Sequence, residues 1–241
     1  MRLFHVSDLH FGRADEAALD WFAAAVARER PDAVIITGDL TMRARSTEYA
    51  AATAWLKRLD VPVSIEPGNH DLPYHNPVMR FLDPYRRYRR VERMLERPLD
   101  LPGIMLVPLK TTARFQWRLN WSFGKVSGSG LEEALTMLTR RRPGDLAIVA
   151  CHHPLVDQGL ESEGRTKGGE QALARLAQAG ADAVLSGHVH DPFDVSVAAG
   201  GREIRLIGAG TLSERTRATP PSFNELTVTD GRLAVIQRMM D

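Results

Sequence analysis

The sequence predicts an α/β protein with a mainly parallel sheet in its first half and antiparallel strands toward its end. Three observations carry this prediction. Short apolar runs alternate with helix-patterned segments over the first 65 residues, an order typical of parallel strands joined by right-handed crossovers. Polar clusters follow these apolar runs directly. After residue 190 the helical patterns stop, and strand-like runs separated by tight turns follow.

The first three strands are expected at residues 2–6, 32–36 and 61–65. The middle run is continuously apolar and β-branched, as in a strand that is buried on both faces. Helices are expected at residues 15–30 and 46–59, where apolar residues recur at near-helical spacing. Asp15 and Ser46 are the expected N-caps, and Pro31 ends the first helix.

Residues 74–100 interrupt this alternation with a segment of helical propensity that is dense in arginine. Its arginines are Arg80, Arg86, Arg87, Arg89, Arg90, Arg93 and Arg97. Two interpretations stay open: a solvated helix with one apolar side, or a lid or rim that attracts an anionic substrate. We expect this insertion to lie within one domain that spans residues 1–241, because no linker or repeat divides the chain.

The rest of the chain continues the alternation and then abandons it. Strands are expected at residues 104–109, 145–151 and 183–185, and helices at residues 129–142 and 170–178. Four antiparallel strands are then expected at residues 193–197, 203–207, 223–228 and 233–236.

The composition is that of an ordinary globular protein. Of the 241 residues, 44% are hydrophobic and 25% charged, and the formal net charge is +1. This charge gives no reason to expect nucleic acid or a membrane surface as partner. Cys151 is the only cysteine, which excludes an intrachain disulfide. Without a signal-peptide pattern or a membrane-length apolar run, we expect a cytoplasmic protein of open oligomeric state.

Side chains that bind metals or move protons follow five of the predicted strands. The clusters are Asp8-Leu9-His10, Gly38-Asp39, Pro67-Gly68-Asn69-His70-Asp71, His152-His153-Pro154 and Gly187-His188-Val189-His190. Loops at strand ends are where α/β proteins place their chemistry. At an extended strand end, the spacing of two in Asp-x-His and His-x-His points both side chains the same way. One loop can therefore supply two ligands to the same metal ion.

The expected metal ligands are nitrogen and oxygen donors without a thiolate. They are Asp8, His10, Asp39, Asn69, His152, His188 and His190. Such donors suit Mn²⁺, Fe²⁺/Fe³⁺ or Zn²⁺ and argue against a structural cysteine-type zinc site. Seven ligands are too many for one catalytic ion that keeps an open position. They suit two ions roughly 3.5–4 Å apart that share a carboxylate.

Structural explanations exist for each of these residues alone. A single histidine is usually structural, as we expect for His5 and His75, and an aspartate after a strand commonly caps a helix. These explanations do not account for the whole set, because six of the eight histidines fall at strand ends beside glycine, aspartate or proline.

In order along the chain, the five clusters resemble the five sequence blocks of the calcineurin-like metallophosphoesterases. The matching patterns are Asp8-x-His10, Gly38-Asp39, Gly68-Asn69-His70-Asp71, His152-x-Pro154 and Gly187-His188-x-His190. The resemblance implies a four-layer αββα sandwich of two mixed β-sheets with a dinuclear site at its edge. It implies one ion held by Asp8, His10, Asp39 and His190. It implies a second ion held by Asp39, Asn69, His152 and His188, so that Asp39 is the bridge.

The resemblance also implies a metal-dependent phosphoric ester hydrolase. A water that bridges two cations has its pKa lowered toward neutrality, so it attacks phosphorus as hydroxide. His70 is the expected general acid for the leaving alkoxide, because it adjoins Asn69 but is not a ligand in the family pattern. Asp71, the second expected catalytic residue, either orients His70 or caps a turn.

Differences between this sequence and the motifs of other branches of the superfamily reduce the range of expected substrates. Ser/Thr protein phosphatases typically carry the pattern Gly-Asn-His-Glu, whereas this chain has Asp71 in place of the glutamate. UDP-diacylglucosamine hydrolases typically have arginine where this chain has His70. Double-strand-break nucleases are usually longer, with a capping domain for DNA. The chain most resembles small bacterial cyclic-nucleotide and glycerophosphodiester phosphodiesterases. We therefore expect a small phosphodiester, with a cyclic nucleotide such as cAMP as the leading candidate. Glycerophosphodiesters, nucleotide sugars and nucleic acid are the alternatives.

Substrate contacts are expected from Asn69, His153, Arg118 and Asn120. Trp117 or Trp121 either stacks on a base or anchors the fold, and residues 213–217 are a further segment that faces the site. A function of a different class also stays open, because some proteins of this fold are binding scaffolds with a degraded metal site. The complete set of ligands favours an enzyme.

Overall fold

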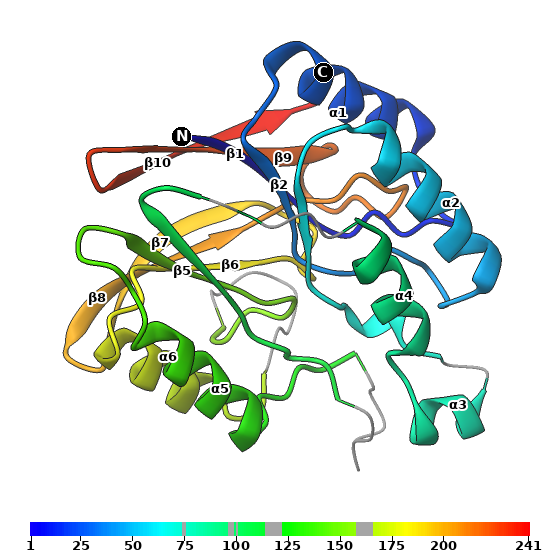
Figure 1. Ribbon diagram of the computed structural model, residues 1–241. Coiled ribbons are helices and arrows are strands. Elements are labelled where there is room, and N and C mark those ends of the chain that lie inside the picture. The colour runs from blue at the N-terminus through cyan, green and yellow to red at the C-terminus, as the bar shows by residue number, and fades with distance from the viewer. Residues whose placement is uncertain (74–75, 96–98, 100, 114–121, 158–165) are drawn as a thin grey trace.

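The computed structural model describes residues 1–73, 76–95, 99, 101–113, 122–157 and 166–241. Two five-stranded sheets lie face to face, with helices on both outer sides (Figure 1). The strand orders are β10-β9-β1-β2-β3 and β4-β5-β6-β8-β7. Both sheets combine parallel and antiparallel pairs, which confirms the predicted sandwich of two mixed sheets.

The first sheet contains the three N-terminal strands as parallel neighbours. These are β1 (Arg2–Val6), β2 (Ala33–Ile36) and β3 (Val63–Ile65). A C-terminal hairpin of β9 (Ser222–Thr229) and β10 (Arg232–Met239) extends the sheet antiparallel to β1. Leu3 of β1 belongs to the apolar cluster between the sheets, whereas Phe4 belongs to the cluster under the helices. β1 is therefore buried on both faces, and its buried polar side chain, His5, lies within hydrogen-bond distance of the Thr37 hydroxyl at 3.0 Å.

Helices α1 (Glu16–Glu29) and α2 (Ser46–Arg58) cover this sheet. Asp15 is the N-cap of α1, as predicted, and its carboxylate accepts a hydrogen bond from the Ala18 amide at 3.1 Å. The predicted cap of α2 is wrong by one residue, because Ser46 is already helical and Arg45 is the N-cap. The Glu48 carboxylate accepts from the Arg43 and Arg45 amides, so the start of α2 needs no serine hydroxyl.

The second sheet has four parallel strands and one antiparallel edge strand. The parallel strands are β4 (Ile104–Pro108), β5 (Leu146–Ala150), β6 (Ala183–Ser186) and β8 (Arg202–Gly208). β7 (Phe193–Ala199) pairs antiparallel with β8. The sequence predicted only antiparallel pairing for β8, and the parallel pair with β6 corrects that expectation.

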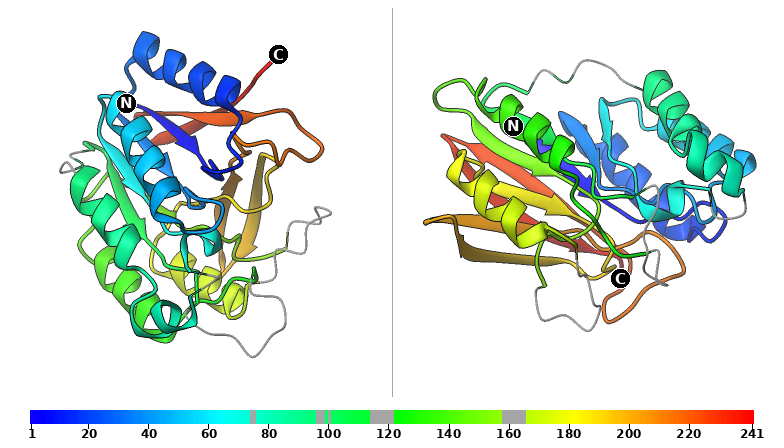
Figure 2. Two further views of the ribbon diagram at one scale, coloured as in Figure 1. Left: turned by 90° about the vertical axis from the view of Figure 1, so that its right-hand side faces the viewer. Right: turned by 90° about the horizontal axis from the view of Figure 1, so that it is seen from below.

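Helices α5 (Gly128–Leu138) and α6 (Gly169–Gln178) cover the outer face of the second sheet. Seen from below in Figure 2, this pair lies on the side of the sheets opposite to α1 and α2. α5 ends four residues before the predicted boundary at residue 142. Tight turns that close through the amides of Arg140 and Arg141 replace its last predicted turn.

The arginine-rich insertion contains α3 (Pro77–Leu82) and α4 (Arg86–Leu95), which agrees with its helical propensity. Tyr88 and Val91 of α4 are buried in the core beneath α1 and α2, and the Tyr88 hydroxyl donates to the Ile65 carbonyl. Arg89 and Arg90 lie on the exposed side of the helix. In the described ranges, no helix has the length and apolar character needed to cross a bilayer.

Candidate metal centre

The predicted site residues converge where the parallel strands of both sheets end. Asp8 and His10 follow β1, Asp39 follows β2, and Asn69 and His70 follow β3. From the second sheet, His152 and His153 follow β5, and His188 and His190 follow β6. The backbone amide of His188 donates to Asp8 Oδ2 at 2.7 Å, and His152 Nε2 lies 3.5 Å from Asp39 Oδ2. The site therefore lies at the seam between the two sheets.

One group of donor atoms is formed by Asp8, His10 and His190. Asp8 Oδ1 lies 3.1 Å from His190 Nε2 and 3.5 Å from His10 Nε2, and the two imidazole nitrogens are 3.2 Å apart. Two ligands of one ion, each bonded at about 2.1 Å, lie roughly 3.0–3.4 Å apart. These three atoms thus have the mutual spacing of ligands to a single ion.

A second group is formed by Asp39, Asn69 and His152. His152 Nε2 lies 3.0 Å from Asn69 Oδ1, and the Asp39 Oδ2 atom lies 3.5 Å from His152 Nε2 and 3.8 Å from His10 Nε2. A single carboxylate oxygen therefore faces both groups. This is the position that a bridging carboxylate occupies between two ions.

Backbone carbonyls orient the imidazole rings. His152 Nδ1 donates to the Thr37 carbonyl at 2.7 Å, and His190 Nδ1 donates to the Arg215 carbonyl at 2.6 Å. In each ring the proton is held on Nδ1, which leaves Nε2 free to bind a metal.

The ligand loops adopt an unusual backbone conformation. Positive φ angles occur at Asp8 (56°), His10 (46°), Asp39 (53°), His188 (71°) and His190 (66°). Non-glycine residues rarely adopt this left-handed region, and strain of this kind concentrates at functional sites. The extended strand ends assumed for Asp-x-His and His-x-His are therefore wrong. At these five ligands the side chains converge because the backbone turns.

Glycines stand beside the ligands because other ligands approach them closely. A Cβ atom on Gly68 would lie 2.0 Å from Asp39 Oδ1. A Cβ atom on Gly187 would lie 1.8 Å from the Ser7 hydroxyl and 2.7 Å from Asp8 Oδ2. Any larger residue would displace a ligand, which explains the pairs Gly68-Asn69 and Gly187-His188 in physical terms.

The electrostatics of the site keep the carboxylates of Asp8 and Asp39 charged. Burial opposes ionisation, but His190 and His10 hold the pKa of Asp8 well below its usual value. Burial opposes ionisation of Asp39 too, and His152 lowers that pKa. Burial disfavours protonated His152, yet Asp39 raises the pKa of this imidazole to about 9. A bound metal ion would replace that proton.

These residues fit a pair of metal ions. Asp8 Oδ1 is buried, and in the described part of the chain it makes no well-aligned hydrogen bond. Such an atom is costly to bury unless a cation compensates it. Together with the spacing of the donors, this favours metal binding at Asp8, His10, Asp39, Asn69, His152 and His190. His188 lies in the same cluster, with donor atoms of His152, His153 and His188 within 4.8 Å of one another.

His70 lies at the edge of this cluster. Its backbone amide donates to Asp39 Oδ1 at 2.8 Å, and its Nδ1 lies 2.7 Å from the Met42 carbonyl. The contact that orients the ring is thus made by Met42 rather than by Asp71. The Asp71 carboxylate instead accepts hydrogen bonds from the amides of Leu40 and Gly68, among others.

His153 is buried beside the ligands, with partners on both ring nitrogens. Nδ1 lies 2.9 Å from the Thr111 hydroxyl and Nε2 lies 2.9 Å from the Ser122 carbonyl. Only the face of the ring is left for the substrate contact predicted for His153. Arg118, Asn120, Trp117 and Trp121 lie outside the described residues.

Arg215 is a site residue whose role the sequence left unassigned. Its Nη1 atom lies 3.3 Å from His10 Nε2 and 3.2 Å from His70 Nε2. Its position follows from the path of the chain after β8, which no residue spacing reveals.

Comparison with known proteins identifies the family. The sequence profile of the calcineurin-like phosphoesterases matches residues 1–192. The chain belongs to the calcineurin-like phosphoesterase family. The expected resemblance is confirmed, and calcineurin-like phosphoesterases use a dinuclear metal centre.

Two curated relatives are phosphodiesterases by name. A probable glycerophosphodiester phosphodiesterase from Arcobacter nitrofigilis is 29% identical over 137 residues, which cover 56% of this chain and 46% of that protein. A probable cyclic nucleotide phosphodiesterase from Pseudoalteromonas sp. is 26% identical over 206 residues, which cover 80% of this chain and 72% of that protein. The chain thus spans about half the length of the first relative and nearly three quarters of the second.

Among solved structures, a dimetal phosphatase from Danio rerio superposes with a TM-score of 0.69. The alignment covers 99% of this chain and 96% of that one, at 16% sequence identity. At this identity the likeness shows the fold alone, and it agrees with the two mixed sheets described above.

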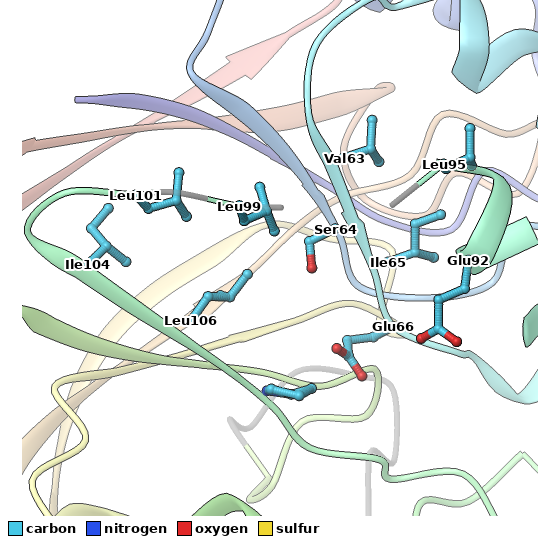
Figure 3. A pocket seen from close by; sticks show the side chains of 11 residues that line it. Val63, Ser64, Ile65, Glu66, Glu92, Leu95, Leu99, Leu101, Ile104 and Leu106 are labelled. Carbon is cyan, nitrogen blue, oxygen red and sulfur yellow. The ribbon is translucent and has the colours of Figure 1, made fainter. Parts of the chain in front are cut away.

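A cavity of about 510 Å³ lies between β3 and β4, the edge strands of the two sheets (Figure 3). Its walls include Val63, Leu101 and Leu106, and the carboxylates of Glu66 and Glu92 lie at one end of it. Burial raises the pKa of Glu66 to about 8, a shift that Lys110 opposes and Glu92 supports. The residues that line this cavity include none of the predicted site residues, so it is separate from the metal centre.

Proposed function

We propose that the protein is a dinuclear metal-dependent phosphodiesterase. The observation that carries the proposal is the convergence of Asp8, His10, Asp39, Asn69, His152, His188 and His190 at one seam, with His70 beside them. The two relatives named as phosphodiesterases support a diester over a monoester substrate.

The proposed ligand sets are those that the resemblance implies. Asp8, His10, Asp39 and His190 hold one ion, and Asp39, Asn69, His152 and His188 hold the other. The shared position of Asp39 Oδ2, 3.8 Å from His10 Nε2 and 3.5 Å from His152 Nε2, supports a bridging role. When bound, the two ions neutralise charge on the phosphoryl oxygens and lower the pKa of the attacking water. Mn²⁺, iron and Zn²⁺ all suit these donors.

His70 is the proposed general acid. The Met42 carbonyl accepts from Nδ1 at 2.7 Å, so Nε2 is the nitrogen that exchanges a proton with the leaving oxygen. The leaving alkoxide needs that proton, because an unprotonated alkoxide is a poor leaving group. The backbone amide of His70 donates a hydrogen bond to Asp39, and this contact holds His70 close to the metal ligands.

A cyclic nucleotide such as cAMP is the leading substrate candidate, and a glycerophosphodiester is the second. Alignment with the probable cyclic nucleotide phosphodiesterase over 80% of this chain supports the first. The somewhat higher identity of the glycerophosphodiester relative, over 56% of this chain, supports the second. Either is a small, soluble phosphodiester.

A turnover panel under Mn²⁺ tests the proposal. It contains bis-p-nitrophenyl phosphate, cyclic nucleotides, glycerophosphodiesters, nucleotide sugars and single-stranded DNA. We expect hydrolysis of small diesters that a chelator abolishes and added metal restores. If the protein binds two ions but leaves every ester intact, the phosphodiesterase proposal is wrong and a binding scaffold replaces it.

A further inference from the structure

The loop after β8 brings a guanidinium into the candidate site from outside the five sequence blocks. Arg215 Nη1 lies 3.3 Å from His10 Nε2 and 3.2 Å from His70 Nε2. One side chain thus faces both a predicted metal ligand and the proposed general acid.

Buried hydroxyl groups hold this loop in place. The Thr211 hydroxyl donates to the Asp8 carbonyl at 2.6 Å and accepts from the Ser213 amide at 3.1 Å. The Ser213 hydroxyl accepts from the Arg215 amide at 3.3 Å. The side chains of Thr211 and Ser213 are fully buried, so the loop is anchored to the ligand loop of Asp8.

The main chain and side chain of Arg215 have separate contacts. Its carbonyl accepts a hydrogen bond from His190 Nδ1 at 2.6 Å, while its guanidinium faces His10 and His70. A substitution at this position removes the guanidinium and keeps the carbonyl that orients His190. The two contacts are therefore separable by experiment.

The charge of Arg215 points to an anionic ligand. A guanidinium is protonated at every relevant pH and only donates hydrogen bonds. Beside two cations it is repelled unless an anion lies between them. The non-bridging oxygens of a phosphodiester carry negative charge, and a guanidinium matches their geometry with parallel donors.

We propose that Arg215 binds a non-bridging phosphoryl oxygen of the substrate, between His70 and the metal ligands. This inference rests on the proposed function. On substrate binding, the guanidinium exchanges its contact with His70 Nε2 for the phosphoryl oxygen. His70 Nε2 then faces the leaving oxygen, and Arg215 fixes the orientation of the phosphorus centre.

The test measures binding of inorganic phosphate to the Mn²⁺-loaded protein by calorimetry. The variants are Arg215→Ala and Arg215→Lys. Arg217→Ala is the matched control, because Arg217 is an exposed arginine two residues along the same loop. We expect the phosphate Kd to rise at least 10-fold in Arg215→Ala, less in Arg215→Lys, and to stay unchanged in Arg217→Ala. All variants keep the metal content of the parent protein.

Kinetics on a diester give a second readout, with a larger rise in KM for Arg215→Ala than for Arg215→Lys. Unchanged phosphate affinity in Arg215→Ala, with both ions retained, would overturn the role of Arg215 even in an active phosphodiesterase. Loss of metal in Arg215→Ala would also overturn it, since the side chain would then support the metal site itself. Failure of the parent protein to hydrolyse any ester refutes the proposed function alone, because phosphate binding still reports on Arg215.

Discussion

Asp39 and His70 are joined by a hydrogen bond of 2.8 Å between carboxylate Oδ1 and the backbone amide. The other oxygen of the same carboxylate faces His152 and His10. The proposed bridging ligand therefore also positions the loop that carries the proposed acid. A change in the charge or place of Asp39 affects both the ions and His70.

Replacement of Asp39 tests the bridge. We expect Asp39→Ala to lower the metal content from two ions to one or fewer, because the oxygen that faces both donor groups is lost. Asp39→Asn keeps an oxygen that can accept from the His70 amide, and we expect it to lose metal as well. The measurement is elemental analysis of protein purified with Mn²⁺, with Asp20→Ala on the exposed side of α1 as control. Two ions at full occupancy in Asp39→Ala would rule out a shared ligand.

Replacement of His70 separates acid catalysis from metal binding. We expect His70→Ala to keep both ions and to lose about 100-fold or more in turnover of diesters with alkyl leaving groups. The loss is smaller for bis-p-nitrophenyl phosphate, since nitrophenolate departs without a proton. The measurement is kcat on matched esters together with metal content. An equal loss on both leaving groups would contradict a general-acid role.

Asp71 is expected to act on stability more than on turnover. Its carboxylate is 1% exposed and accepts from the amides of Leu40, Thr41 and Gly68 and from the Thr41 hydroxyl. Asp71→Ala leaves three amides without this acceptor, so we expect the free energy of unfolding to fall by about 3–5 kcal/mol. Urea unfolding of the metal-loaded protein measures this, with Asp20→Ala as control. A stable Asp71→Ala variant that loses only kcat would instead support a role of Asp71 in orienting His70.

Glu66 is expected to make stability depend on pH. Its pKa of about 8 in the folded protein lies above the usual 4.5, so the folded state favours the protonated acid. The contribution of the neutral acid is complete below about pH 4.5 and is lost as the pH rises through 8. Two neighbouring groups act on this pKa, because Lys110 lowers it and Glu92 raises it.

Glu66→Gln removes this titration. We expect the variant to gain stability over the parent between pH 5 and pH 8, by up to about 5 kcal/mol given 1.4 kcal/mol per pKa unit. Urea unfolding at several pH values measures the difference, and Glu203→Gln, at an exposed residue of β8, is the control. A constant difference between parent and Glu66→Gln across this range would contradict the buried acid.

The sequence predicts the framework well, because burial leaves a direct pattern. β2 is buried on both faces and reads as an uninterrupted apolar run, and Asp15 caps α1 by ordinary local chemistry. The ligand-bearing segments were found because each polar cluster directly follows a strand. The parallel pairing of β8 with β6 was missed, since the direction of a strand depends on tertiary contacts rather than on its own residues.

The details of the site could not be predicted from the sequence either, because they also depend on tertiary contacts. The left-handed backbone at His188 and His190 cannot be predicted from the sequence, because histidine adopts this conformation at only a small share of its positions. The orienting carbonyl of Met42 and the guanidinium of Arg215 belong to residue types with no distinctive pattern. Their roles depend on where distant segments meet.

The position of the site at the seam between the sheets has a consequence for how the protein unfolds. Asp8, Asp39 and Asn69 follow strands of one sheet, and His152, His188 and His190 follow strands of the other. Bound ions would be coordinated by residues of both sheets, so neither sheet alone provides a complete site. In hydrogen–deuterium exchange, the metal-loaded protein should unfold as a single cooperative unit. After chelation of the metals the two sheets should be less tightly coupled, and amides at the strand ends nearest the seam should then exchange first.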